Sequence, residues 1–237
     1  MRPMDVRIGF FSFTEITDPG AHRAYNEWHQ LDHQPEQYTI PGVAYGERWV
    51  ATPACRAARA VVDERLAPAH YVTIYLMGPP LQETLEAFGA LAKSLWAAGR
   101  FFEPRRALLS GPLEITGRAV AARALVSADV VPVRPNRGVY VVVEASTGPP
   151  AAGALDALAA LPGVAGAWAF DATSAFSALG FDAGAHRITV AWLDEPPLSV
   201  APALDGIVDG GDVFSGPVVF AGPFETIDPW AWDWFDA

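Results

Sequence analysis

The sequence contains one cysteine, Cys55, in 237 residues. A single thiol cannot form a disulfide within the chain, so a small fold held together by bridges is excluded. Hydrophobic residues make up 51% of the sequence, which is enough for a sizeable core. The opening residues MRPMDVRIGFFSF lack the basic, then apolar, then small-residue order of an export signal. We therefore expect a globular protein of the reducing cytoplasm.

Positive charge and long apolar runs are also scarce. Lysine and arginine total 16 against 27 aspartates and glutamates, which gives a net charge of −11. Such a chain repels phosphate backbones and anionic membrane surfaces. Charges, glycines and prolines interrupt every apolar run before the ~20 residues that a membrane helix needs. We expect neither a nucleic-acid partner nor a membrane partner.

The chain repeats itself in three blocks that occur in the same order. The paired blocks are Ile40–Ala54 with Leu161–Ala175, His70–Leu81 with His186–Leu198, and Gly111–Thr116 with Gly222–Ile227. The offset between partners falls smoothly from 121 to 116 to 111 residues. Repetition of this kind indicates a duplicated unit whose second copy has shorter connections.

Each copy shows the same order of expected elements. In the first copy these are a strand at 6–13, a helix from Asp18-Pro19 to about His33, strands at 43–51 and 71–77, a helix at 81–96 and a strand at 107–116. Pro35 and the Pro41-Gly42 pair are expected to end the first helix. The second copy offers strands at 139–145, 164–170, 187–193 and 217–224, with helices at 154–161 and 200–208.

The order βαββαβ is that of the ferredoxin-like unit, an antiparallel sheet with both helices on one face. One unit leaves a sheet face bare, so two units are expected to pack sheet on sheet. The fold class predicted is α+β: two tandem ferredoxin-like units forming an intrachain pseudo-dimeric α/β barrel. We place the first unit at 1–118, a linker at 119–136 and a degenerate second unit at 137–237.

Polar residues gather on the first helix. A projection at about 100° per residue places Asp32 in the apolar arc beside Tyr25, where a carboxylate needs a partner. His29 and His33 lie along the edge of the same arc, one turn apart. The second copy has no histidine in its first helix, so we expect the first unit to carry the site.

The neighbouring strands add aromatic and charged groups. Alternation places Tyr45, Glu47 and Trp49 on one face of their strand and Arg48 on the other. Tyr71 and Tyr75 share a face of the next strand. If these faces meet the helix, a wet aromatic cavity follows.

Residues Tyr25–Val50 resemble the motif of EthD-like members of the dimeric α/β barrel superfamily, in which a helix with aromatic, histidine and proline residues leads to Pro-Gly and an arginine-bearing strand. The matching residues are Trp28, His29, His33, Pro35, Pro41, Gly42 and Arg48. That superfamily includes cofactor-free cyclases, monooxygenases and isomerases as well as haem-dependent enzymes, so the resemblance fixes the fold better than the reaction. It implies a small, largely apolar ligand between helix and sheet, with a histidine at its edge. This chain departs from the motif by adding His29 before His33 and by its aromatic tail.

We predict an enzyme without a cofactor that acts on a small aromatic or polyketide-like metabolite by proton transfer, as a cyclase, isomerase, lyase or monooxygenase. The predicted catalytic residues are His33, His29, Asp32 and Tyr75, with His33 as acid or base. The predicted substrate-binding residues are Tyr45, Arg48, Trp28, Glu47 and Tyr71. Cys55 is interpreted as structural.

Three alternatives stay open. His29 and His33 could bind a metal with Glu36, although no metal is our prediction, or either of them or His70 could hold a haem. The chain could instead be a binding or assembly protein on the same fold. A homodimer could form through sheet edges or through the tail Asp228–Ala237, which holds three tryptophans in ten residues.

Overall fold

The computed structural model describes residues 5–146, 151–179, 184–211 and 213–236. The fold is a mixed α+β arrangement built on one antiparallel sheet. The strands are β1 (Ile8–Ile16), β2 (Val43–Val50), β3 (Val61–Val62), β4 (Tyr71–Met77), β5 (Arg105–Val120), β6 (Gly138–Glu144), β7 (Val164–Ala172), β8 (Arg187–Leu193) and β9 (Val218–Thr226). The α-helices are α1 (His22–Trp28), α2 (Gln34–Gln37), α3 (Pro53–Ala57), α4 (Leu81–Ala97), α5 (Ala154–Ala160) and α6 (Pro197–Gly210).

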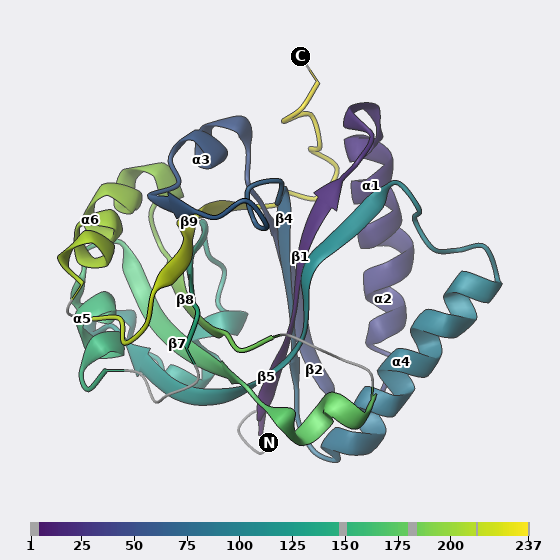
Figure 1. The fold of residues 1–237 in the computed structure, drawn as a ribbon, viewed down its shortest axis with the longest axis horizontal. Coiled ribbons are helices and arrows are strands. Elements are labelled where there is room, and N and C mark those ends of the chain that lie inside the picture. The colour runs from purple at the N-terminus through teal and green to yellow at the C-terminus, as the bar shows by residue number, and fades with distance from the viewer. Residues whose placement is uncertain (1–4, 147–150, 180–183, 212, 237) are drawn as a thin grey trace.

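The strand order closes the sheet on itself. Neighbouring strands follow the order β2-β4-β1-β5-β7-β8-β6-β9-β3, and a further pairing joins β2 to β9 through Trp49 and Val50. Helices α1, α2 and α4 lie outside one side of the sheet and α5 and α6 outside the other, as Figure 1 shows. The free edges that sequence reasoning offered for dimer formation are therefore engaged within the chain at β2, β5, β7 and β9.

The two halves repeat their strand pairing residue by residue. Arg48 lies opposite Thr73 where β2 meets β4, and Ala169 lies opposite Thr189 where β7 meets β8. Both pairings carry an irregularity directly after their first residue. The preceding glycines, Gly42 and Gly163, have φ values of +93° and +84°, a conformation that L side chains rarely adopt. A Cβ atom on Gly42 would collide with Thr84 of α4, so this glycine also permits the close approach of strand and helix.

The space enclosed by the strands is filled by side chains. Phe11, Trp49, Trp168, Trp192 and Phe220 belong to one buried cluster with more than a dozen aliphatic neighbours. Rings of the two halves meet there: Phe11 and Phe170 lie edge to face with centroids 4.8 Å apart. Burial of this aromatic surface is the main force that holds the halves together. The cavity of functional interest must therefore lie outside the barrel, under the helices.

The first helix is longer than its proline pattern predicts. His29–His33 form a π-helical turn in which the Gln34 N–H donates to the carbonyl of His29, and α2 then continues to Gln37. Pro35 has no N–H to donate, and the backbone adapts by widening the turn before it rather than by ending the helix. Asp18 caps the start through the Gly20 N–H, as its position before Pro19 predicts.

Other elements differ from expectation in modest ways. Strand β5 extends to Val120 because it pairs with β1 along its first half and with β7 along its second. The linker predicted at 119–136 therefore begins inside a strand and continues as short 3-10 turns. Helix α3 and strand β3 were not predicted. Residues 1–4, on which part of the export-signal argument rests, lie outside the described residues.

The aromatic tail returns to the first half of its own chain. The Trp232 Nε1–H donates to the Gln30 side chain over 2.6 Å, and Phe235 stacks on His22 with centroids 3.8 Å apart. Trp232 is buried, whereas Trp230 is exposed. Within the described residues, no helix is long and apolar enough to cross a membrane.

Candidate functional site

A cavity of about 180 Å³ lies between the first-half helices and the outer face of the sheet. An apolar cavity of ~150 Å³ takes up benzene, so this space suits one aromatic ring. The lining residues are Phe10, Ser12, Thr14, Tyr25, Trp28, His29, His33, Gln37, Thr73, Tyr75, Phe88, Gly89, Ala92, Phe101, Arg105 and Ser110. The small Gly89 and Ala92 on α4 leave the room that a larger side chain would fill.

The sheet gives the cavity a polar floor. Strand β1 alternates, so Phe11 and Phe13 enter the barrel while Ser12 and Thr14 face the helices. The Ser12 and Thr14 hydroxyls lie 3.3 Å apart. Ser110 of β5 lies opposite Ser12 in the register, and Thr73 of β4 completes the set. Four hydroxyl groups can therefore meet a polar edge of a ligand.

The π-helical turn brings two histidines to the roof. His29 is buried, and burial together with the charge of Arg48 holds its pKa well below the ordinary value. Burial, with the charge of Arg105, lowers the pKa of His33 to about 4. The His33 ring stacks on Trp28 with centroids 4.5 Å apart. Both imidazoles are neutral near pH 7 and can accept a proton.

Five of the residues that line this cavity have a buried polar atom without a hydrogen-bond partner among the described residues. These atoms are His29 Nδ1, His33 Nδ1, Gln37 Oε1, Tyr75 Oη and Arg105 Nε. Buried polar groups are almost always satisfied, because an unmade hydrogen bond costs about 1–3 kcal/mol. Five such atoms around one cavity indicate a ligand-binding site. Burial also raises the pKa of Tyr75, so its hydroxyl stays a donor.

Arg48 lies directly behind the cavity wall. Its guanidinium carbon is 4.7 Å from the ring centre of Tyr25 and 5.0 Å from that of Tyr71, and its Nη2 donates to Asn26 Oδ1 over 2.6 Å. Asn26 in turn donates to the Tyr71 hydroxyl, which lies 3.0 Å from His22 Nδ1. This network fixes Arg48 without supplying a carboxylate.

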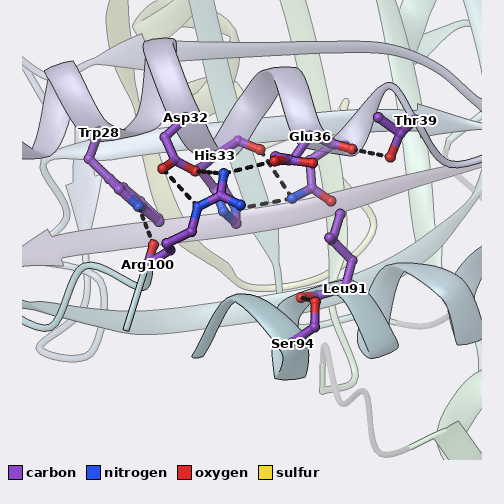
Figure 2. A network of polar contacts seen from close by, with 9 residues as sticks. Trp28, Asp32, His33, Glu36, Thr39, Leu91, Ser94 and Arg100 are labelled. Atoms are coloured by element: carbon purple, nitrogen blue, oxygen red, sulfur yellow. Dashed lines mark hydrogen bonds and ion pairs between the residues drawn. The ribbon is translucent and has the colours of Figure 1, made fainter. Parts of the chain in front are cut away.

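A segment after α4 closes the side of the cavity. Arg100 bonds both Asp32 and Glu36 of the helical roof, and its backbone carbonyl accepts from Trp28 Nε1, as Figure 2 shows. Phe101 then lines the cavity, and the Arg105 guanidinium lies 4.3 Å from the Phe101 ring centre. Arg100 thus anchors the segment that supplies both residues.

Four of the predicted site residues line the cavity: His29, His33, Tyr75 and Trp28. Asp32 does not, which corrects the projection. The π-helical turn has more residues per turn than the 100° projection assumes, so Asp32 rotates outward to pair with Arg100 at 2.8 Å while its neighbour Leu31 is also exposed. A projection at about 100° per residue also predicts Leu31 in the apolar arc, and its exposure shows that this prediction is wrong.

Two other predicted residues face the barrel. Tyr45 and Glu47 share a face of β2 with Trp49, as alternation predicts, but the helices cover the opposite face. The Tyr45 hydroxyl donates to Glu47 over 2.5 Å, Asn136 donates to the same carboxyl, and burial raises the pKa of Glu47 to about 7. Tyr71 supports Arg48 from behind the wall.

Sequence reasoning missed Arg105, Gln37 and the hydroxyl floor. The floor had a signal, since FFSFT alternates aromatic and hydroxyl residues. Gln37 was missed because the helix was expected to end before it. Arg105 and Arg106 are adjacent at the start of β5, and the sequence alone does not say which one turns inward. Cys55 is buried with its Sγ 3.3 Å from Glu225, and burial raises the pKa of the thiol to about 12, consistent with a structural role.

The geometry bears on the metal and haem alternatives. Among the residues that the structure describes, no three His, Cys, Asp or Glu side chains group closely enough to hold a metal ion, and Glu36 is occupied by Arg100. A haem carries four pyrrole rings, and a cavity of about 180 Å³ does not accommodate them. Neither group fits this site.

Comparisons with known proteins support the fold. A candidate chlorite dismutase, TA0507, aligns over 98% of this chain and 98% of its own with a TM-score of 0.50 and 10% identity. The chain shares the dimeric α/β barrel fold. A candidate monooxygenase from Lactobacillus acidophilus NCFM covers 93% of this chain and 99% of its own at a TM-score of 0.40 and 10% identity, too low to carry an argument. No family model and no curated protein matches the sequence.

Proposed function

We propose that the protein is an enzyme that needs no cofactor and moves a proton on a small substrate with one aromatic ring, using His33 as the base. The observation that carries this proposal is the set of five unpartnered buried polar atoms on residues that line one ring-sized cavity. A multi-ring polyketide is too large for this space, so the substrate class narrows to single-ring compounds.

The proposed step is enolisation next to a carbonyl group. His33 takes a proton from the carbon beside the carbonyl, the electron pair of that C–H bond forms a C=C bond, and the carbonyl oxygen becomes an enolate oxygen. The Tyr75 hydroxyl donates to this oxygen and stabilises its charge. Return of the proton from His33 to a different atom completes an isomerisation, so atoms and charge balance without a further reactant.

His33 is preferred to His29 because the base must exchange its proton with water. His29 is only 3% exposed, whereas His33 is partly exposed. Its low pKa keeps the imidazole in the base form at neutral pH. His29, deeper in the cavity, is proposed to orient the substrate through its free ring nitrogen.

We also propose that the chain consists of two copies of one ferredoxin-like unit and belongs with the EthD-like proteins. The matching registers of β2 with β4 and of β7 with β8 support the duplication. The motif residues Trp28, His29 and His33 surround the cavity, which supports the EthD-like assignment. The TA0507 structure is named as a candidate chlorite dismutase, and we do not propose that activity for this chain.

The test is exchange of substrate hydrogen with D2O, followed by NMR on two single-ring probes, acetophenone and phenylpyruvate. We expect the wild type to accelerate exchange at the carbon beside the carbonyl for at least one probe. His33→Gln should slow exchange at least 100-fold, which is typical for loss of a general base. Tyr75→Phe should slow it about 10-fold or more.

Two variants control this test. Ala92→Leu fills the cavity from α4 and should abolish exchange while the protein stays folded. His186→Ala removes a histidine of the second half and should leave exchange unchanged. Binding of a probe without any exchange would reject the enzyme and favour a binding protein, whereas equal accelerated rates in the wild type and the His33 variant would reject His33 as the base.

A further inference from the structure

We infer that the cavity binds its ligand as an anion, a single aromatic ring whose carboxylate or phenolate oxygen is held by the Arg105 guanidinium. This inference rests on the proposed function and adds the charge of the substrate to it. It follows from the presence of an arginine, and the absence of any aspartate or glutamate, among the residues that line the cavity.

The cavity contains a cation and no carboxylate. Arg105 is one of the residues that line the cavity, and its buried Nε has no partner among the described residues. None of the lining residues is an aspartate or glutamate. The guanidinium rests on aromatic rings instead, 4.3 Å from the centre of Phe101 and 5.6 Å from that of Trp28. Rings soften the loss of hydration but leave the positive charge unpaired.

A second guanidinium adds to the same field. Arg48 is 4% exposed, and its Nε and Nη1 also lack partners among the described residues. The charges of Arg48 and Arg105 both lower the pKa of His29 and of His33, so their positive potential reaches across the roof. Asp32 opposes it at His33, but Arg100 holds that carboxylate at the surface.

Hydrogen-bonding capacity points the same way. Tyr75 Oη and Arg105 Nε are donors, Gln37 Oε1 is an acceptor, and each neutral histidine has one N–H and one lone pair, which His33 needs for its role as the base. Of these groups only the Arg105 guanidinium carries a charge, so a negatively charged acceptor oxygen satisfies its Nε–H best. An anion also supplies the missing countercharge, while the aromatic walls hold its ring.

The test is calorimetric titration with benzoate and with benzamide, which have the same shape and differ in charge. We expect the wild type to bind benzoate at least 10-fold more tightly than benzamide. Arg105→Gln should lower benzoate affinity at least 10-fold and leave benzamide affinity unchanged. The control is Arg106→Gln, which removes the same charge from the next residue. Arg106 is an exposed partner of Glu15, and its loss should change neither affinity.

Each outcome decides the inference. Equal affinity of the wild type for the two probes, or binding of neither, overturns it, and this comparison needs no variant. Unchanged benzoate affinity in Arg105→Gln overturns the role of Arg105. Failure of the proposed function is distinguishable: benzoate would still bind selectively while no probe exchanges hydrogen. His33→Gln should lose exchange but keep its preference for benzoate.

Discussion

Both halves of the chain bury arginine, but only the second half buries carboxylates to match it. Arg187 of β8 is fully buried with Nε 2.8 Å from Asp171 and Nη1 3.5 Å from Glu144. Glu144 also accepts from the backbone N–H groups of Ser215 and Gly216. Among the described residues, Arg48 and Arg105 of the first half are surrounded by rings and amides and form no ion pair with a carboxylate. A paired buried charge is structural, whereas an unpaired one beside a cavity calls for a ligand.

The matched positions sharpen the contrast. By strand register, Arg48 corresponds to Ala169, and the repeat that aligns His70 with His186 makes Ala191 the counterpart of Tyr75. Under the second-half helices, Tyr140, Leu158, Val200 and Leu204 form a packed apolar cluster. At these matched positions the second half has small side chains where the first half has polar ones that line or support the cavity. We therefore expect stability and chemistry to respond to different mutations.

The largest expected effect comes from breaking the paired arginine. Arg187→Met leaves Asp171 and Glu144 buried without a countercharge, so we expect about 3–5 kcal/mol less unfolding free energy in urea. Arg123→Met is the control, because its pair with Asp194 is largely exposed and worth under ~1 kcal/mol. A loss below ~1 kcal/mol in the Arg187 variant would show that the pairing is not structural.

The second-largest effect is expected when an arginine equivalent to Arg48 is introduced at the matching position of the second half. Ala169→Arg places a guanidinium at a fully buried position of β7 without an equivalent of Asn26 or Tyr71. We expect the unfolding free energy to fall by about 3 kcal/mol, from the unpaired charge and the added volume. Ala169→Met provides volume without charge and should cost less. If the two variants are equally stable, the loss of stability comes from the added volume, and the second half does not discriminate against a buried charge.

The pH dependence of stability should report His33. Its folded pKa is about 4 against the ordinary 6.5, so the unfolded chain binds more protons between these values. Stability is therefore full above about pH 6.5 and is lost as pH falls toward 4. A pKa difference of one corresponds to ~1.4 kcal/mol, so with its shift from 6.5 to about 4 we expect His33 to account for roughly 3 kcal/mol of the loss.

The measurement is the difference between wild type and His33→Gln in urea unfolding at pH 7 and pH 4.5. Taking the difference removes the shared contributions of His22 and His70, whose pKa values burial also lowers, to about 4 and about 3. It also removes that of Glu47, whose raised pKa acts with the opposite sign. Parallel profiles for the two proteins would mean that His33 is solvated like a surface residue.

Removing the unpaired arginine should cost binding more than stability. Arg48→Met keeps the stack between Tyr25 and Tyr71 and deletes a charge that has no carboxylate partner. We expect the unfolding free energy to fall by about 1 kcal/mol, less than in Arg187→Met, because only Asn26 Oδ1 loses a donor and no buried carboxylate loses its countercharge. Benzoate affinity should fall about 10-fold in calorimetry. A stability loss like that of Arg187→Met would contradict the distinction between the halves.

The sequence predicts the strands and the faces of their side chains better than it predicts the residues of the candidate site. The prediction places strand β4 at its observed ends, Tyr71–Met77, because a β-rich run bounded by turn residues predicts a strand and little else. Alternation also assigned Arg48 and Glu47 to opposite faces of β2. The helical projection misplaced Asp32 because it assumes a constant number of residues per turn. The local sequence does not indicate that His29–His33 form a wider π-helical turn. Arg105 reaches the cavity because of the path that the chain takes after α4. That path depends on tertiary packing, which the local sequence pattern does not predict.

The smallest effect tests that segment. Arg100 holds Asp32 and Glu36 from outside the cavity, and all three side chains are partly exposed. Arg100→Gln should loosen the position of Phe101 and Arg105 and lower benzoate affinity three- to fivefold, with little change in urea unfolding. Arg7→Gln, which removes a more exposed pair with Asp5, is the control for surface charge. Because Arg100 acts only through position, its loss should weaken benzoate and benzamide by the same factor, whereas loss of Arg105 should weaken benzoate alone. A selective loss of benzoate in Arg100→Gln would instead make Arg100 part of the anion site.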